Sequence, residues 1–123
     1  MDYFYCVVCG NMCEMVENGG GQMYCCGQEM AKLKGNEDDS ASKEKHVPIY
    51  WLEGNKVHVR VGEVDHPMED SHYIKWITVK TNNGTYSKVL GPNEKPVACF
   101  TVNDGEQVKE VYAYCNIHGL WKK

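Results

Sequence analysis

The sequence lacks several features that mark common functional classes. It has no basic excess, since 13 Lys and Arg residues stand against 17 Asp and Glu residues, for a formal net charge of −4. Because phosphates must be neutralised by basic residues, we expect no nucleic-acid partner. No apolar run is long enough to span a bilayer, and the start Met1–Cys6 lacks the basic region of a secretory signal. We therefore expect no membrane partner and a cytoplasmic location.

Cysteine and histidine are abundant and unevenly distributed. The chain has seven cysteines and five histidines. Five of the cysteines lie within the first 26 residues, and every histidine comes after residue 45. Cysteines in a reducing compartment seldom form disulfides, so metal binding is the leading explanation. The distribution predicts two metal sites, one rich in sulfur and one rich in imidazole.

A polar, charged segment at residues 35–44 divides the chain. It is typical of a linker, and we place the boundary near residue 36, which gives domains at 1–36 and 37–123. Chains below about 40 residues seldom fold without a metal, a disulfide or a partner, so the first domain needs its metal. Its three consecutive glycines, Gly19–Gly21, predict a hairpin-like turn between two cysteine-bearing arms.

The second segment has the pattern of an all-β domain. Val57, Val59 and Val61 alternate with His58 and Arg60, which is the period of a half-buried strand. Further strands are expected at 73–80, 85–90, 97–102 and 108–114, separated by Gly-, Asn- and Pro-containing turns. No long helical period is present, so we expect an antiparallel sandwich or barrel.

The first candidate site consists of cysteines alone: Cys6, Cys9, Cys25 and Cys26. Two residues between Cys6 and Cys9 allow both sulfurs to reach one tetrahedral ion. Neighbouring side chains tend to point apart, so the second pair requires a turn, for which Gly27 is suited. Four thiolates select zinc or a single iron, and spacing does not distinguish the two. The fifth thiol, Cys13, is expected to be a packed, free cysteine.

The second candidate site combines nitrogen and sulfur donors: His46, His66, His72, Cys115 and His118. All five are predicted at strand ends or in loops, where a β scaffold presents a site. Five donors exceed the four of structural zinc, whereas six-coordinate iron would keep one position open. His58 is expected to be a solvated strand residue and Cys99 a core residue, both outside the site.

These motifs resemble the desulfoferrodoxin family of two-iron superoxide reductases. Cys6-Val7-Val8-Cys9-Gly10-Asn11 with Cys25-Cys26-Gly27 is similar to the desulforedoxin domain. The stretches Glu44–Pro48, His66–Met68 and Cys115–Gly119, with His72 and Trp76, are similar to the superoxide reductase domain. The resemblance implies a mainly β protein, in which a small desulforedoxin-like metal domain precedes an immunoglobulin-like antiparallel β-sandwich.

The resemblance also implies a function. One iron would be bound by the four cysteines, and a second by the four histidines with Cys115 as axial ligand. The second would reduce superoxide to hydrogen peroxide in defence against oxidative stress, with Lys45 attracting the anion and Glu44 closing onto the oxidised iron. Rubredoxin is the expected electron donor, and a homodimer the expected assembly. A rubredoxin-like electron carrier and a structural zinc module are the alternatives.

Overall fold

The computed structural model describes residues 2–38, 40 and 45–123, and these residues form strands, turns and loops without a helix. No helix in that part of the chain could therefore serve as a membrane span. The chain separates into two compact units, Met1–Lys34 and Gly35–Lys123. Each unit is described by itself below.

The first unit contains five short strands, β1 to β5. Their bounds are β1 Asp2–Tyr5, β2 Met12–Met15, β3 Tyr24–Cys25, β4 Gln28–Glu29 and β5 Ala31–Lys32. β1 pairs with β2 on one side and β5 on the other, while β3 and β4 form a separate hairpin. The predicted hairpin turn at Gly19–Gly21 is wrong, because β2 and β3 do not pair. The glycines lie instead in the long connection between two different sheets.

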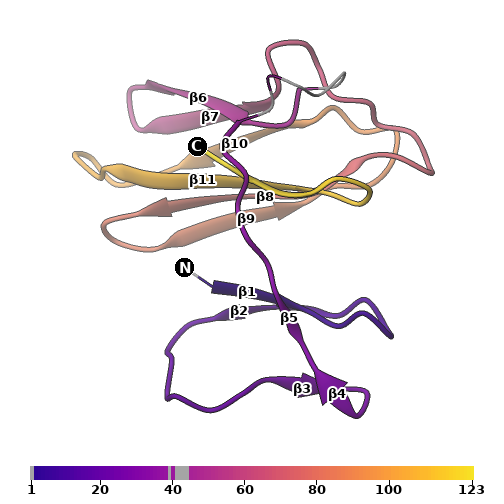
Figure 1. The fold of residues 1–123 in the computed structure, drawn as a ribbon. Coiled ribbons are helices and arrows are strands. Elements are labelled where there is room, and N and C mark those ends of the chain that lie inside the picture. Colours follow the sequence, from indigo (N-terminus) through magenta and orange to yellow (C-terminus); the bar gives the residue numbers. More distant parts are fainter. Residues whose placement is uncertain (1, 39, 41–44) are drawn as a thin grey trace. The chain divides into compact units, whose positions relative to one another are not determined.

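The second unit is an antiparallel β-sandwich of seven strands. Its strands are β6 Pro48–Glu53, β7 Lys56–Val61, β8 Ile74–Thr81, β9 Thr85–Val89, β10 Val97–Thr101, β11 Val108–Cys115 and β12 Gly119–Lys122. One sheet has the order β10-β7-β6 and the other β12-β11-β8-β9, which form the two layers seen in Figure 1. Three strands against four is the immunoglobulin-like arrangement, so the predicted fold class is confirmed.

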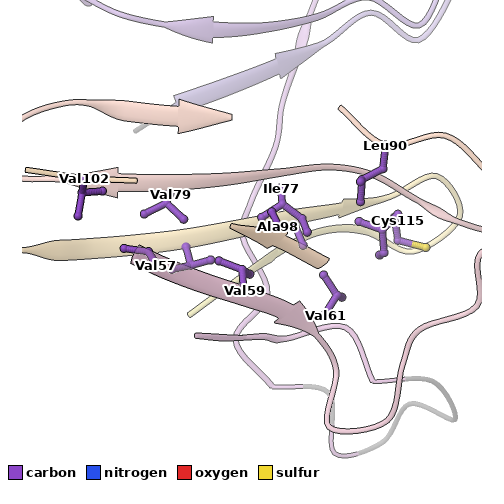
Figure 2. Close-up of a cluster of buried hydrophobic side chains, with 12 residues drawn as sticks. Val57, Val59, Val61, Ile77, Val79, Leu90, Ala98, Val102 and Cys115 are labelled. Atoms are coloured by element: carbon purple, nitrogen blue, oxygen red, sulfur yellow. The ribbon is translucent and has the colours of Figure 1, made fainter. Parts of the chain in front are cut away.

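The core lies between these two layers, and strand alternation explains its composition. Val57, Val59 and Val61 of β7 point inward and are at most 1% exposed. They face Ile77 and Val79 of β8 across the sandwich, as Figure 2 shows. Each such side chain contributes about 1.5–3 kcal/mol when fully buried. The valine pattern in the sequence therefore identified the correct face of this strand.

Cys115 occupies one end of this apolar core. Its side chain belongs to the buried cluster and lies at the same end as Val61, away from Val57 and Val102 (Figure 2). The register between β11 and β8 shifts here, since Tyr114 pairs with Trp76 and Cys115 with Ile74. β8 thus carries one extra residue, a bulge of the kind that redirects side chains near functional sites.

Two details of the second unit differ from the sequence prediction. Cys99 is exposed rather than buried, so its assignment to the core is wrong. The alternation of β10 turns the neighbouring Ala98 inward and Cys99 outward. The strand β12 was not predicted, because its four residues, Gly119–Lys122, are too few to show a period. The error at Cys99 arises because β10 is apolar on both faces, and β12 was missed because it is short.

Candidate metal centres

Two turns of the first unit bring the four predicted cysteine sulfurs together. Cys6 follows β1 and Cys9 lies in the turn after it, while Cys25 ends β3 and Cys26 begins the turn to β4. Their four sulfur atoms all lie within 4.8 Å of one another. Cys6 is buried, whereas Cys9 and Cys26 are exposed. The cluster therefore sits at the surface of its unit with one sulfur anchored inside.

The adjacent cysteines converge because of an unusual turn. Cys26 has a φ of 52° and Gly27 a φ of 78°, and these are the two residues between β3 and β4. Positive φ at both central residues defines a type I′ hairpin turn, which few side chains tolerate. The turn that the sequence required at Cys25-Cys26 is thus present, with glycine at its second position.

The sulfur spacing fits a tetrahedral ion. The Sγ atoms of Cys9 and Cys25 are 3.7 Å apart, and those of Cys25 and Cys26 are 3.9 Å apart. Four sulfurs at about 2.3 Å from one ion would be separated by roughly 3.8 Å in a regular tetrahedron. This geometry suits either zinc or iron, since both accept four thiolates.

Backbone and amide N–H groups face these sulfurs. The Cys9 N–H donates to Cys6 Sγ at 3.5 Å and the Asn11 N–H to Cys9 Sγ at 3.4 Å. The Asn11 side chain also donates to Cys25 Sγ at 3.6 Å, a role that the cysteine spacing did not reveal. Such donors favour thiolate charge, as expected of a site that binds a cation.

The thiol pKa values diverge within the cluster. The hydrogen bond from the Cys9 N–H lowers the pKa of Cys6 to about 6. Hydrogen bonding to the Cys9 sulfur raises the pKa of Cys26 to about 12. Cys6 is therefore poised as a thiolate, while Cys25 and Cys26, whose pKa values are raised, hold their protons more tightly until a cation offsets their charge.

The second cluster lies at the end of the sandwich core marked by Cys115. Its five donors come from three segments: the residues before β6, the connection from β7 to β8, and the end of β11 with its turn into β12. In chain order they are His46, His66, His72, Cys115 and His118, and all their ligand atoms lie within 4.8 Å of one another. His46, His66 and Cys115 are buried, whereas His118 is exposed. The cluster is therefore open to solvent on the side of His118.

The four imidazoles form a closed ring. Ring centroids are 4.6 Å apart for His46 and His66, and 4.7 Å apart for His66 and His72. The ring closes through His118, at 5.1 Å from His72 and 4.8 Å from His46. Each histidine thus neighbours two others, which is the arrangement required of four ligands in one plane. Cys115, which belongs to the apolar core, is the fifth potential donor of the cluster.

The contacts of the ring nitrogens indicate which of them are available to an ion. His66 Nδ1 lies 2.8 Å from the Pro67 carbonyl oxygen, so it carries the proton and leaves Nε2 for the cluster. His72 Nε2 is buried and has no hydrogen-bond partner among the described residues. His46 Nε2 and His118 Nδ1 are 3.1 Å apart. Two nitrogens at about 2.1 Å from one ion and at right angles would be roughly 3.0 Å apart.

Neighbouring residues hold these donors in place. The Asn116 side chain accepts from the Tyr73 N–H at 2.9 Å and donates to the Ser71 carbonyl at 3.1 Å. It thereby ties the turn after Cys115 to the segment that carries His72. Trp121 stacks on His46, with ring centroids 4.5 Å apart and an interplanar angle of 12°. Neither residue was identified from the sequence, although Asn116 lies within the predicted Cys115–His118 turn.

The remaining candidates lie elsewhere or beyond the described residues. Lys45 is partly buried and directly precedes His46. Glu44 lies outside the residues that the structure describes. Cys13 is half-buried in β2 and is not among the four clustered sulfurs. His58 lies on the outer face of β7, where it stacks on Trp51 with centroids 5.3 Å apart, so it is shielded rather than simply solvated.

The donor sets therefore fit two different metal sites. The four-sulfur cluster fits a tetrahedral ion and its chemistry suits iron or zinc. The second cluster has five donors, which exceeds the four of a closed structural zinc site. His72 Nε2, a buried nitrogen with no hydrogen-bond partner among the described residues, is the kind of atom that metal ligation would satisfy. Iron, which takes six ligands in haem and related proteins, would retain one position for a small molecule.

Models of one protein family match both units of the chain. The family model described as desulfoferrodoxin matches residues 38–123, and the one for the desulfoferrodoxin N-terminal domain matches residues 1–33. A desulfoferrodoxin homolog of Archaeoglobus fulgidus is 48% identical over 99% of this chain and 95% of its own length.

Two solved structures of superoxide reductases are also similar to this chain. The superoxide reductase of Treponema pallidum aligns with a TM-score of 0.82 at 31% identity, covering 99% of this chain and 95% of the other. A superoxide reductase of Giardia intestinalis aligns with a TM-score of 0.58 at 40% identity, covering 66% of this chain and 96% of the other.

Proposed function

Because this chain belongs to the desulfoferrodoxin family, we propose that it is a superoxide reductase that works at the four-histidine, one-cysteine cluster. The reaction adds one electron and two protons to superoxide and gives hydrogen peroxide, without forming dioxygen. The observation that carries the proposal is the closed ring of four imidazoles with the buried Cys115 sulfur in the same cluster. A simple electron carrier would need only the four-cysteine cluster.

We propose iron as the metal of both clusters. In the second cluster, bound iron would supply the electron and a coordination position for the substrate. The ligands would be Nε2 of three histidines, Nδ1 of His118 and the sulfur of Cys115. The Cys115 sulfur receives a backbone N–H from His118 at 3.5 Å, which helps to keep it as a thiolate. Its position in the apolar core protects it from solvent.

Lys45 is proposed to attract the substrate. Superoxide is an anion, and the protein carries a formal net charge of −4, so approach needs a local positive charge. Lys45 directly precedes a proposed ligand and is only partly buried, so it is the positive charge that we propose for this role. A positive charge there also stabilises negative charge that develops on the reacting oxygen atoms. From the family resemblance alone, Glu44 is proposed as the residue whose carboxylate would bind the oxidised iron.

The cellular setting is part of the proposal. All seven cysteines are free of disulfides, which supports a reducing, cytoplasmic environment. A small one-electron carrier such as rubredoxin would supply the electrons.

The first unit exposes the apolar side chains Val7, Val16 and Tyr24, which supports association into a homodimer. Sedimentation analysis should give twice the monomer mass, whereas a monomer at micromolar concentration would contradict the dimer.

A pair of histidine variants tests the site. His72→Ala removes a proposed ligand, whereas His58→Ala removes a histidine outside the cluster. With superoxide generated by pulse radiolysis and the protein loaded with iron, His72→Ala should lose the reaction and His58→Ala should keep the wild-type rate. Equal rates in both variants would contradict the assignment.

A further inference from the structure

Gly62 lies where the backbone is unusually crowded. It is buried, directly follows β7 and has a φ of +85°, which side chains rarely adopt. A Cβ atom at this position would lie 2.5 Å from the Lys45 carbonyl oxygen and 2.6 Å from that of Val64, where ordinary contact begins at 3.4 Å. Both obstacles are backbone atoms, so neither can rotate away. Six other described glycines, Gly54 and Gly105 among them, also have a positive φ, but nothing lies within 4 Å of a Cβ built on them.

This crowding joins two segments that carry proposed ligands. The Gly62 N–H donates to the Val47 carbonyl at 3.3 Å, next to His46. On the other side, the His66 N–H donates to the Val61 carbonyl at 3.3 Å. The chain at Gly62 is therefore held simultaneously against the segment of Lys45 and His46 and against the base of the loop that supplies His66.

The Arg60 side chain secures the same turn. Its Nε donates to the Gly62 carbonyl at 3.3 Å, and its Nη2 donates to the Glu63 carbonyl at 3.2 Å. A guanidinium presents its donors in a rigid fork, so it fixes two successive carbonyls in one geometry. Lysine would keep the charge but could not form the fork.

From these contacts we infer that Gly62 is a positioning residue, which sets Lys45 and His46 relative to His66, with Arg60 as its support. The inference deepens the proposed function, since it concerns the metal centre of that site. Residues that orient metal ligands typically change metal affinity by about 10–100-fold when mutated. A displacement of about 1 Å at a reacting centre can lower a rate by about 10²-fold.

The test compares Gly62→Ala with Gly105→Ala in the full-length protein. Both variants place alanine at a similar positive φ, +85° and +79°, but only Gly62→Ala creates the backbone clash. Ferrous iron affinity of the histidine cluster is measured by competition with a chelator, and the four-cysteine centre serves as internal reference. We expect at least tenfold weaker binding in Gly62→Ala and wild-type binding in Gly105→Ala.

Arg60→Lys provides a second test of the same contacts. If Gly62→Ala does not fold, Arg60→Lys replaces it and should weaken iron binding severalfold while its near-ultraviolet circular dichroism stays that of the wild type. Wild-type affinity in Gly62→Ala, or in Arg60→Lys when Gly62→Ala is unfolded, would overturn the inference. Iron binding is measured without superoxide, so a wild-type protein that binds iron and leaves superoxide unreacted refutes the proposed function alone.

Discussion

Trp121 offers a direct way to ask whether ligand orientation contributes to metal binding. Its indole is 7% exposed and stacks on His46 at 4.5 Å, nearly parallel to the imidazole. Trp121→Leu removes the stack, whereas Trp121→Phe keeps an aromatic ring in its place. Because the stack restrains the His46 ring before metal binds, losing it should weaken the site.

The size of this effect follows from the stacking energy. Aromatic pairs contribute about 0.5–1.5 kcal/mol beyond the area that they bury. Each 1.4 kcal/mol corresponds to a tenfold change in an equilibrium constant, so the iron affinity should fall about two- to twelvefold. The loss of iron-binding free energy in Trp121→Phe should be less than half of the loss in Trp121→Leu.

The chain provides a matched control for this stack. Trp51 stacks on His58 at 5.3 Å and 13°, but His58 is outside the metal cluster. Trp51→Leu should therefore leave iron affinity unchanged. Affinity is measured by chelator competition on the iron-depleted protein. Equal affinities of Trp51→Leu and Trp121→Leu, or equal losses in Trp121→Leu and Trp121→Phe, would refute the reasoning.

Three other experiments test the charge of Lys45, the ligands of the four-cysteine centre and the stability of the fold. Lys45→Ala should slow superoxide consumption and flatten its dependence on ionic strength; an unchanged salt profile would remove the steering role. Cys13→Ser should keep the visible absorption of both iron centres, whereas Cys26→Ser should lose that of the four-cysteine centre. The reverse pattern would show a misassigned ligand. Glu106 accepts hydrogen bonds from the Thr81 hydroxyl and the Asn103 N–H, which hold the pKa of its carboxyl below its ordinary 4.5. Its contribution to stability is therefore complete above pH 4.5 and is lost as the pH falls through the lower, folded-state pKa. In metal-free protein, urea unfolding from pH 6 to pH 3 should show a smaller loss of stability for Glu106→Gln than for wild type, and parallel curves would contradict this.

The sequence was informative wherever a pattern repeats or a donor type is rare. Alternating valines identified β7 and its inward face, because one side of that strand is buried between two sheets. The cysteine and histidine sets were recognisable because few other uses explain such spacings. Tight turns could also be inferred, since two adjacent cysteines such as Cys25 and Cys26 can meet one ion only where the chain turns.

Other features depend on contacts between distant segments and could not be predicted. Cys99 was misplaced because an apolar neighbourhood does not tell which face of a strand is inward. Asn116 acts through hydrogen bonds to residues more than 40 positions away, and its type alone gives no such signal. Gly62 resembles any other glycine in the sequence, and only the fold brings the Lys45 carbonyl against it.

Product stoichiometry tests the central claim most directly. Superoxide is supplied to the iron-loaded protein with an excess of electron donor, and hydrogen peroxide and dioxygen are both measured. A reductase that uses the histidine cluster should give one hydrogen peroxide for each superoxide consumed and no dioxygen. One hydrogen peroxide for every two superoxide ions, with dioxygen released, would show disproportionation and contradict the account.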